Sequence, residues 1–388
     1  MKLKLGFIFG LTLSYFQAFA QPIARVENVK IQSTALNQER EILIYTPIDY
    51  DWRTNEYFNV IYVFDSQNRE FFDYTSSMIS FLTNGDKPFI VVGITSPYNE
   101  KIDYSRNNDL LPFLETEKSR SRYGKYHGNA DDFLKYVSHE VVPYINANYR
   151  TLDHNTAVGH SLSASFILYS LIKNPSLFSN YIAISPNFAY DDEVLAKQLV
   201  GFDYSGVKEV KYLFLSHANE GIEYWQEWKP AREKVYAFFS EGFDNQKISV
   251  NISSYPENNH WNTFPVALKD AVEYFFENIS DAQGSQLSDE LTEVNIRINV
   301  QNENDTIYIS GNQPNLGDWD PGKIQMKKTS GFERAINLKI KSPAMFKFTK
   351  GTWDTALQIV GTYDHVIIKP KTKTEYEFEM VKITDQDH

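Results

Sequence analysis

Two different hydrophobic periods divide the chain. Between about residues 23 and 279, short apolar runs alternate with longer segments whose apolar residues recur every three to four positions. The runs at 41–45, 60–64, 88–94, 181–184, 210–215 and 248–252 predict strands, and segments such as 130–149, 163–172 and 266–276 predict amphipathic helices. Because strands alternate with helices, we expect an α/β domain over residues 21–279 with a mostly parallel sheet covered on both faces.

The hydrophobic period changes to two after a polar stretch. Residues 280–292 are rich in Ser, Asp, Gln and Gly, and we interpret them as a linker. Beyond it Val294, Ile296 and Ile298 alternate with polar residues, and similar pairs recur as far as Tyr376 and Phe378. Short alternating strands separated by Gly, Pro and Asn predict a small all-β sandwich over residues 293–384.

The first twenty residues have the organisation of a signal peptide. Lys2 and Lys4 precede an apolar stretch, and Ala18 and Ala20 form a small-x-small cleavage pattern before Gln21. We therefore expect residues 1–20 to be removed and the protein to be secreted or periplasmic. The apolar run is shorter than the roughly 20 residues that cross a bilayer, and no second long run follows, so we expect no membrane span.

Charge and cysteine content exclude several classes of function. The formal net charge is −12 and no basic cluster interrupts it, which argues against nucleic acid as a partner because phosphate binding needs a basic face. The chain has no cysteine, which excludes disulfides, thiolate catalysis and cysteine-ligated metal. An exported protein without disulfides suggests a bacterial source.

Candidate chemistry centres on Ser161, in Gly159-His-Ser-Leu-Ser163, where a predicted strand turns into a predicted helix. This is the setting of a nucleophile elbow, a turn so sharp that small residues must flank the serine. The pattern departs from G-x-S-x-G at its last position, where Ser163 replaces Gly. The alternative interpretation is an ordinary strand-to-helix turn.

A nucleophilic serine needs a base and an acid, which follow it along the chain in this fold. His260 lies between the last predicted strand and the last predicted helix and fits the base best, with His217 as the alternative. Glu220 and Glu223 both follow the preceding strand, and we favour Glu220 as the acid that orients the imidazole. Either glutamate could instead be a solvated surface charge.

An oxyanion hole needs two backbone N–H groups. Leu162, directly after the serine, offers one. The other is expected from the loop that follows the strand at 60–64, at Ser66 or Gln67. The loop from Pro97 to His127 is expected to shape the substrate pocket.

Residues 35–279 resemble the esterase family that includes esterase D, the enterochelin esterases, and the feruloyl and acetyl-xylan esterases of carbohydrate esterase family 1. The matching segments are 60–65, 149–151, 159–162 and 184–186, together with the helix that ends at 141–145. The resemblance implies an α/β-hydrolase fold with Ser161 as nucleophile, His260 as base and Glu220 as acid. It implies ester hydrolysis without a metal or an organic cofactor, and it leaves the acyl group open.

The segment Gly311-Asn-Gln-Pro-Asn-Leu-Gly-Asp-Trp319-Asp-Pro321 resembles the signature of family 20 starch-binding modules. The later Phe346-Lys-Phe348 and Trp353 are similar to their Tyr-Lys-Phe strand and following Trp. The resemblance implies a sugar platform of Trp319, Lys347 and Trp353 that binds an α-glucan. The chain departs from the pattern, because the hairpin after Lys347 is short and 361–364 replace the usual Asn-Arg pair. The alternative is a sandwich that keeps its fold and binds nothing.

These observations predict an exported serine carboxylic-ester hydrolase with an appended glucan-binding-like domain. Its partner would be a small-molecule or saccharide ester, such as an acyl, feruloyl or siderophore ester. Two rival interpretations are an acyltransferase on the same fold and a non-catalytic carbohydrate-binding protein. Product analysis with an acceptor sugar distinguishes the first rival from a hydrolase, and activity on p-nitrophenyl acetate excludes the second.

Overall fold

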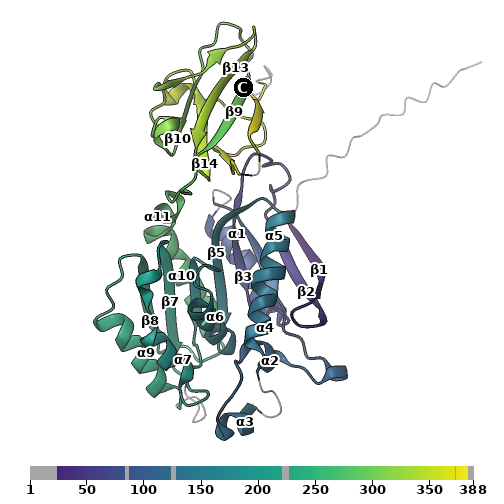
Figure 1. Cartoon of the computed structure of the whole chain (residues 1–388), viewed down its shortest axis with the longest axis vertical. Coiled ribbons are helices and arrows are strands. Elements are labelled where there is room, and N and C mark those ends of the chain that lie inside the picture. The colour runs from purple at the N-terminus through teal and green to yellow at the C-terminus, as the bar shows by residue number, and fades with distance from the viewer. Residues whose placement is uncertain (1–23, 84–86, 124–127, 221–226, 372, 383–388) are drawn as a thin grey trace, which may run out of the picture.

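The computed structural model describes residues 24–83, 87–123, 128–220, 227–371 and 373–382 (Figure 1). The predicted signal peptide at 1–20 and the alternative acid Glu223 lie outside these residues. Within them, no helix combines the length and the apolar character needed to cross a membrane.

The larger part of the molecule is an eight-stranded sheet in the order β1-β2-β4-β3-β5-β6-β7-β8. Its strands are β1 (Arg25–Ser33), β2 (Gln38–Thr46), β3 (Phe58–Val63), β4 (Phe89–Ile94), β5 (Thr151–His160), β6 (Asn180–Ile184), β7 (Lys211–Ala218) and β8 (Ile248–Tyr255). The strands from β4 through β8 run parallel, whereas β1 and β2 pair antiparallel at one edge. The mostly parallel sheet predicted from the alternating pattern is confirmed.

Helices cover both faces of this sheet, so most residues of its central strands β3, β5 and β6 are buried. One face packs on α1 (Arg69–Thr83) and α10 (Thr263–Asn278). The other packs on α4 (Ala130–Lys135), the π-helical turn η2 (Tyr136–Val141), α5 (Val142–Asn148), α6 (Leu162–Lys173), α7 (Val194–Gly201) and α9 (Lys229–Glu241). The shorter elements η1 (Glu100–Ile102), α2 (Arg106–Leu110), α3 (Glu117–Tyr123) and η3 (Tyr204–Gly206) lie in the connections.

The C-terminal part consists of two four-stranded sheets around a separate apolar core. One sheet has the order β11 (Ile324–Gln325), β10 (Tyr308–Gly311), β14 (Ala344–Thr349), β15 (Val366–Ile368). The other has the order β12 (Lys327–Lys328), β13 (Glu333–Ile340), β9 (Thr292–Asn299), β16 (Glu375–Glu379). The 3₁₀ turns η4 (Pro314–Leu316) and η5 (Trp353–Thr355) lie in its loops. Alternating residues of β9 are buried, as the period of two predicts.

The stretch at 280–292 is not entirely irregular. It begins with the short helix α11 (Ser280–Gly284), which connects the two parts in Figure 1. Gln283 on this helix is buried and donates to the Oδ1 of Asn180 at 2.7 Å and to the carbonyl of Val210 at 3.0 Å. These bonds fix α11 to the starts of β6 and β7.

The C-terminal domain contacts the sheet at the amino ends of its parallel strands. The N–H of Asn55, just before β3, donates to the carbonyl of Gly361 at 2.9 Å, and its carbonyl accepts from the N–H of Ile367 at 3.0 Å. Lys369 binds Asp153 at 2.6 Å and the carbonyl of Thr151 at 3.2 Å, near the start of β5. The domain therefore lies at the amino ends of the parallel strands, whereas Ser161 lies at their carboxyl ends.

Gly361 permits this junction, because its φ is +78° and an added Cβ would lie 2.2 Å from Thr54 Oγ1. We expect Gly361→Ala to lower the free energy of unfolding by about 2 kcal/mol, since alanine is strained at positive φ and would push the 52–57 loop away. Calorimetric unfolding measures this, with Gly331→Ala as the matched control, because a Cβ there meets only Glu303 Oε2 at 3.8 Å. Equal stability of the two variants would contradict this account of the junction.

Candidate active site

Ser161 lies in a sharp turn between β5 and α6. Its backbone has φ +60° and ψ −120°, a conformation that non-glycine residues rarely adopt and that is found where function requires it. The turn is tight because a Cβ on Gly159 would lie 2.5 Å from the carbonyl group of Ser163. Ser163, which replaces the usual Gly, is fully buried and donates its hydroxyl to the carbonyl of His160 at 2.9 Å. Ser163 therefore stabilises the tight turn with a hydrogen bond that a glycine at this position could not form.

His260 and Glu220 are brought together from different loops. Glu220 follows β7 and His260 lies between β8 and α10, and the His260 Nδ1 is 2.7 Å from the Glu220 Oε2. Both residues are buried, with 1% of His260 and 8% of Glu220 exposed. Burial would raise the pKa of Glu220, but its hydrogen bond and charge interaction with His260 outweigh burial and lower it. The carboxylate is thus held ionised beside the imidazole.

His160 connects the serine turn to the His260 loop. Its Nε2 lies 2.7 Å from the carbonyl oxygen of His260, and the two ring centroids are 4.7 Å apart. Since a carbonyl only accepts, the Nε2 of His160 carries the proton and donates it. Burial, followed by the neighbouring His260, lowers the pKa of His160 to about 4. This contact was not foreseen, because residues 160 and 260 are far apart in sequence.

The loop after β3 carries Ser66 and Gln67, the two predicted sources of the second oxyanion donor. The N–H of Ser66 already donates to the carbonyl of Ile94 at 3.0 Å, and its hydroxyl donates to the carbonyl of Val63 at 2.8 Å. Across the described part of the chain, the backbone N–H of Gln67 has no acceptor. The geometry therefore favours the backbone N–H of Gln67 over that of Ser66 as the second oxyanion donor. Leu162, the other predicted donor, is the first residue of α6, where helical N–H groups have no acceptor within the helix.

Asp65 and Arg106 fix the position of this loop. Asp65 is buried at φ +62° and accepts from the Nε of Arg106 at 2.8 Å and from the Gln67 side chain at 2.9 Å. Burial alone would raise the pKa of Asp65. The Arg106 guanidinium lowers that pKa by more than burial raises it, so the carboxyl stays ionised. The ion pair connects the β3 loop to α2, within the segment at 97–127 that was predicted to shape the pocket.

A second, fully buried ion pair anchors the same segment. Arg40 on β2 donates from both terminal nitrogens to Asp109 of α2, at 2.7 and 2.9 Å, and Tyr104 donates its hydroxyl to the same carboxylate at 2.6 Å. Tyr104 therefore has a structural partner. No local pattern predicts this pair, because Arg40 and Asp109 are 69 residues apart in the chain.

The predicted sugar-platform residues lie near one another in the C-terminal domain. The rings of Trp319 and Trp353 have centroids 6.4 Å apart, with 40% and 43% of the two residues exposed. Lys347 forms an ion pair with Asp364, next to His365, whose ring is 6.3 Å from that of Trp319. The Lys347 ammonium is thus held by a carboxylate at the side of the Trp pair. Among the described residues, no group of three His, Asp or Glu side chains is placed to hold a metal ion.

The parallel sheet, the strand–turn–helix at Ser161 and the glutamate–histidine pair beyond β7 and β8 define the α/β-hydrolase class. Within that class, residues 33–274 match the family described as "Putative esterase", and the chain belongs to this family.

Individual relatives agree with the family. A segment of 116 residues is 28% identical to the ferri-bacillibactin esterase BesA of Bacillus subtilis and covers 29% of this chain and 40% of that protein. A segment of 112 residues is 30% identical to the siderophore enterobactin esterase of Emericella nidulans and covers 26% of this chain and 37% of that protein. The matches thus span well under half the length of these curated relatives.

Solved structures of similar fold cover the hydrolase domain. An IroE-like serine hydrolase from Shewanella oneidensis superposes with a TM-score of 0.55 at 24% identity, over 65% of this chain and 80% of its own. The siderophore hydrolase EstA of Aspergillus nidulans superposes with a TM-score of 0.54 at 19% identity, over 66% of this chain and 95% of its own. At these identities the likeness concerns the fold.

The low pKa of His160 has a consequence for acid stability. In the unfolded chain a histidine titrates near 6.5, so below that pH the unfolded state binds a proton that folded His160 does not. Stability should therefore fall as the pH drops from about 6.5 towards 4. Between pH 7.5 and 5.0, His160 should account for a loss of about 2 kcal/mol in the free energy of unfolding. The His160→Gln variant should not show this loss. Urea unfolding of both proteins at the two pH values measures the difference, and an identical pH dependence would refute the burial argument.

Proposed function

We propose that this protein is a serine carboxylic-ester hydrolase with Ser161, His260 and Glu220 as its triad. The observation that carries the proposal is the buried His260–Glu220 contact of 2.7 Å, which His160 connects to the turn of Ser161. Glu220 occupies Nδ1, so the neutral imidazole accepts at Nε2, which is the role a general base needs. A paired acid and base, connected through His160 to the turn of a strained serine, argues for catalysis over a purely binding role.

In the proposed reaction Ser161 attacks the ester carbonyl while His260 takes the hydroxyl proton. The oxyanion that forms is stabilised by the backbone N–H groups of Leu162 and Gln67, with Gln67 replacing Ser66. His260 then gives the proton to the leaving alcohol, and water releases the acyl group by the same route in reverse. Glu220 stabilises the imidazolium that forms in both halves.

For the substrate, we propose an ester of the siderophore type. The support comes from the names of the two curated relatives, both siderophore esterases. Feruloyl and acetyl esters of saccharides are the alternatives that the sequence resemblance implies. Hydrolysis of a catecholate trilactone, a feruloyl oligosaccharide and an acetylated xylan, followed by chromatography, decides among them by relative kcat/KM.

Ser161→Ala should abolish labelling by a fluorophosphonate probe and turnover of p-nitrophenyl acetate, because both reactions require the nucleophilic hydroxyl that the substitution removes. The melting temperature should change little, since the hydroxyl fills no part of the apolar core. Ser176→Ala, at an exposed serine before β6, is the matched control and should label as the wild type does. Full labelling of Ser161→Ala would refute the assignment of the nucleophile.

His260→Ala should lower kcat by several orders of magnitude, and Glu220→Ala should lower it by less. The difference arises because water or a neighbouring carboxylate partly replaces an orienting acid, whereas nothing replaces the base. Glu223→Ala is the control for the alternative acid. If that substitution costs more activity than Glu220→Ala, the acid is Glu223 and the triad must be reassigned.

We propose further that the C-terminal domain binds an α-glucan through Trp319, Lys347 and Trp353, and that residues 1–20 direct export. The ten residues of β5 extend over roughly 30 Å between the domain junction and Ser161, so a bound glucan would tether the enzyme without entering its active site. Retention of the protein on amylose should be weakened in Trp353→Ala, because stacking of the indole on a sugar ring contributes about 1 kcal/mol or more. Retention equal to that of the wild type would refute glucan binding at this platform.

A further inference from the structure

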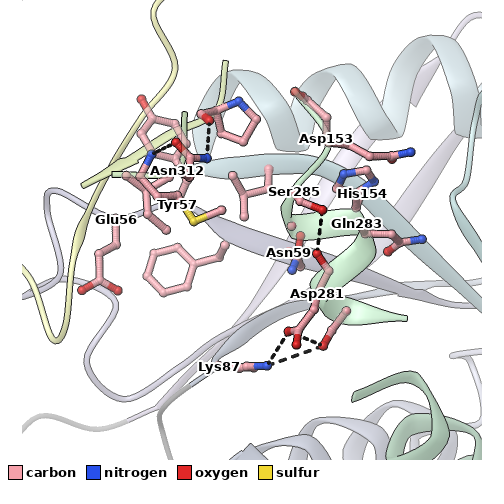
Figure 2. Close-up of a pocket in the computed structure, with 18 of the residues that line it drawn as sticks. Glu56, Tyr57, Asn59, Lys87, Asp153, His154, Asp281, Gln283, Ser285 and Asn312 are labelled. Atoms are coloured by element: carbon pink, nitrogen blue, oxygen red, sulfur yellow. Dashed lines mark hydrogen bonds and ion pairs between the residues drawn. The ribbon is translucent and has the colours of Figure 1, made fainter. Parts of the chain in front are cut away.

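A cleft of about 900 Å³ lies between the two domains, away from Ser161 (Figure 2). One wall consists of the amino ends of β3, β4, β5 and β7 together with α11, and the other consists of loops of the C-terminal domain. Figure 2 shows Tyr57, Asn59 and Lys87 on the first wall and Asn312 on the second. Its volume falls within the range of small-molecule and oligosaccharide sites, which often form at domain interfaces.

We propose that this cleft is a second, non-catalytic binding site for a neutral oligosaccharide. The proposal goes beyond ester hydrolysis and does not depend on it. It also concerns a different surface from the Trp353 side of the platform, because Trp353 does not line the cleft whereas Trp319 does.

Exposed aromatic rings on the cleft wall provide the first argument. Trp319 is 40% exposed and Tyr363 is 53% exposed, and both line the cleft. Trp319 adopts φ +61° and the preceding Asp318 φ +53°, conformations that bulky residues avoid unless the surrounding structure imposes them. The fold therefore accepts backbone strain to keep the indole at the cleft, where its flat face can stack on a sugar ring.

The charges on the walls provide the second argument. The lining contains three basic side chains, Arg53, Lys87 and Lys208, against six carboxylates, Glu56, Asp153, Glu209, Asp281, Asp289 and Asp364. Four of the six are already paired, Glu56 with Arg53, Asp281 with Lys87, Asp153 with Lys369 and Asp364 with Lys347. The walls therefore carry no excess of positive charge that would attract an anion such as a phosphate or an aryl carboxylate. A neutral ligand with many hydroxyls needs no such charge and can donate to the carboxylate oxygens.

The cations of the cleft are also engaged with protein partners. Arg53 is buried, pairs with Asp49 at 2.5 Å and Glu56 at 3.3 Å, and lies 4.4 Å below the centroid of the Tyr363 ring. Lys87 lies 3.8 Å from Asp281, an ion pair that Figure 2 marks with a dashed line. Because one face of the Tyr363 ring packs on Arg53, the side chain is already held in place. It would therefore lose little conformational entropy when a ligand stacks on its exposed side.

The test is calorimetric titration of the full-length mature protein with three neutral pentasaccharides, from amylose, cellulose and xylan, and with an anionic oligogalacturonate. We expect at least one neutral sugar to bind and the anionic sugar not to bind. Tyr363→Ala should weaken binding about fivefold or more through loss of stacking. Phe332→Ala is the matched control, because Phe332 is 55% exposed in the same domain and does not line the cleft.

A second pair of variants separates the cleft from the Trp platform. Ser285 is exposed on the cleft wall, so Ser285→Trp should fill the cleft and abolish binding there, whereas Ser176→Trp at an exposed site outside it should have no effect. Trp353→Ala should leave cleft binding intact. The proposal is wrong if none of the neutral sugars binds, if only the anionic sugar binds, or if Tyr363→Ala and Ser285→Trp bind like the wild type. It is also wrong if Trp353→Ala alone abolishes all binding.

Discussion

The turn at Ser161 is the constraint on which the rest of the site depends. A serine at φ +60° is costly by about 1–3 kcal/mol, and the surrounding structure must hold it there. Gly159 allows the helix to approach the strand, Ser163 closes the turn, and the Ser161 N–H donates to the carbonyl of Ile184 on β6 at 2.9 Å. The central strand, the helix and the neighbouring strand therefore all contribute to one backbone conformation.

Around this turn, burial and neighbouring charges give the two adjacent imidazoles, His160 and His260, different hydrogen-bond partners. Burial keeps His160 neutral, with a pKa of about 4, so it acts as a fixed hydrogen-bond donor. The Nδ1 of His260 lies 2.7 Å from the carboxylate of Glu220, whose pKa is lowered by that contact. The fully buried pair Arg40–Asp109 and the half-buried pair Asp65–Arg106 hold the β3 loop and α2 in place. Breaking the Arg40–Asp109 pair would cost about 3–5 kcal/mol, because one charge would be left buried alone.

The two edges of the parallel sheet serve different purposes in this molecule. The carboxyl ends of the strands carry Ser161, Glu220 and His260, as expected for an α/β sheet. The amino ends carry the C-terminal domain, which Asn55 and Lys369 fix by direct hydrogen bonds. The interdomain cleft and the Trp pair are consequently separated from the catalytic edge by the length of β5.

The sequence by itself determined the elements and the composition of the site. Hydrophobic periods of 3.6 and 2 indicate which segments bury one face, so the sheet, its helices and the C-terminal strands were predictable from local pattern. The helix predicted at 130–149 appears as α4, η2 and α5 over 130–148, and the strand predicted at 248–252 extends to Tyr255. Gly159, Ser161 and the order Ser, Glu, His are likewise readable as motifs. Only the tertiary structure decided the pairings between distant residues, namely His160 with His260, Arg40 with Asp109, and the Ser66 N–H with Ile94, which favours Gln67 as the donor. It also decided where the C-terminal domain docks. These features depend on which groups folding brings within about 3 Å of each other, and the local hydrophobic pattern carries no information about that.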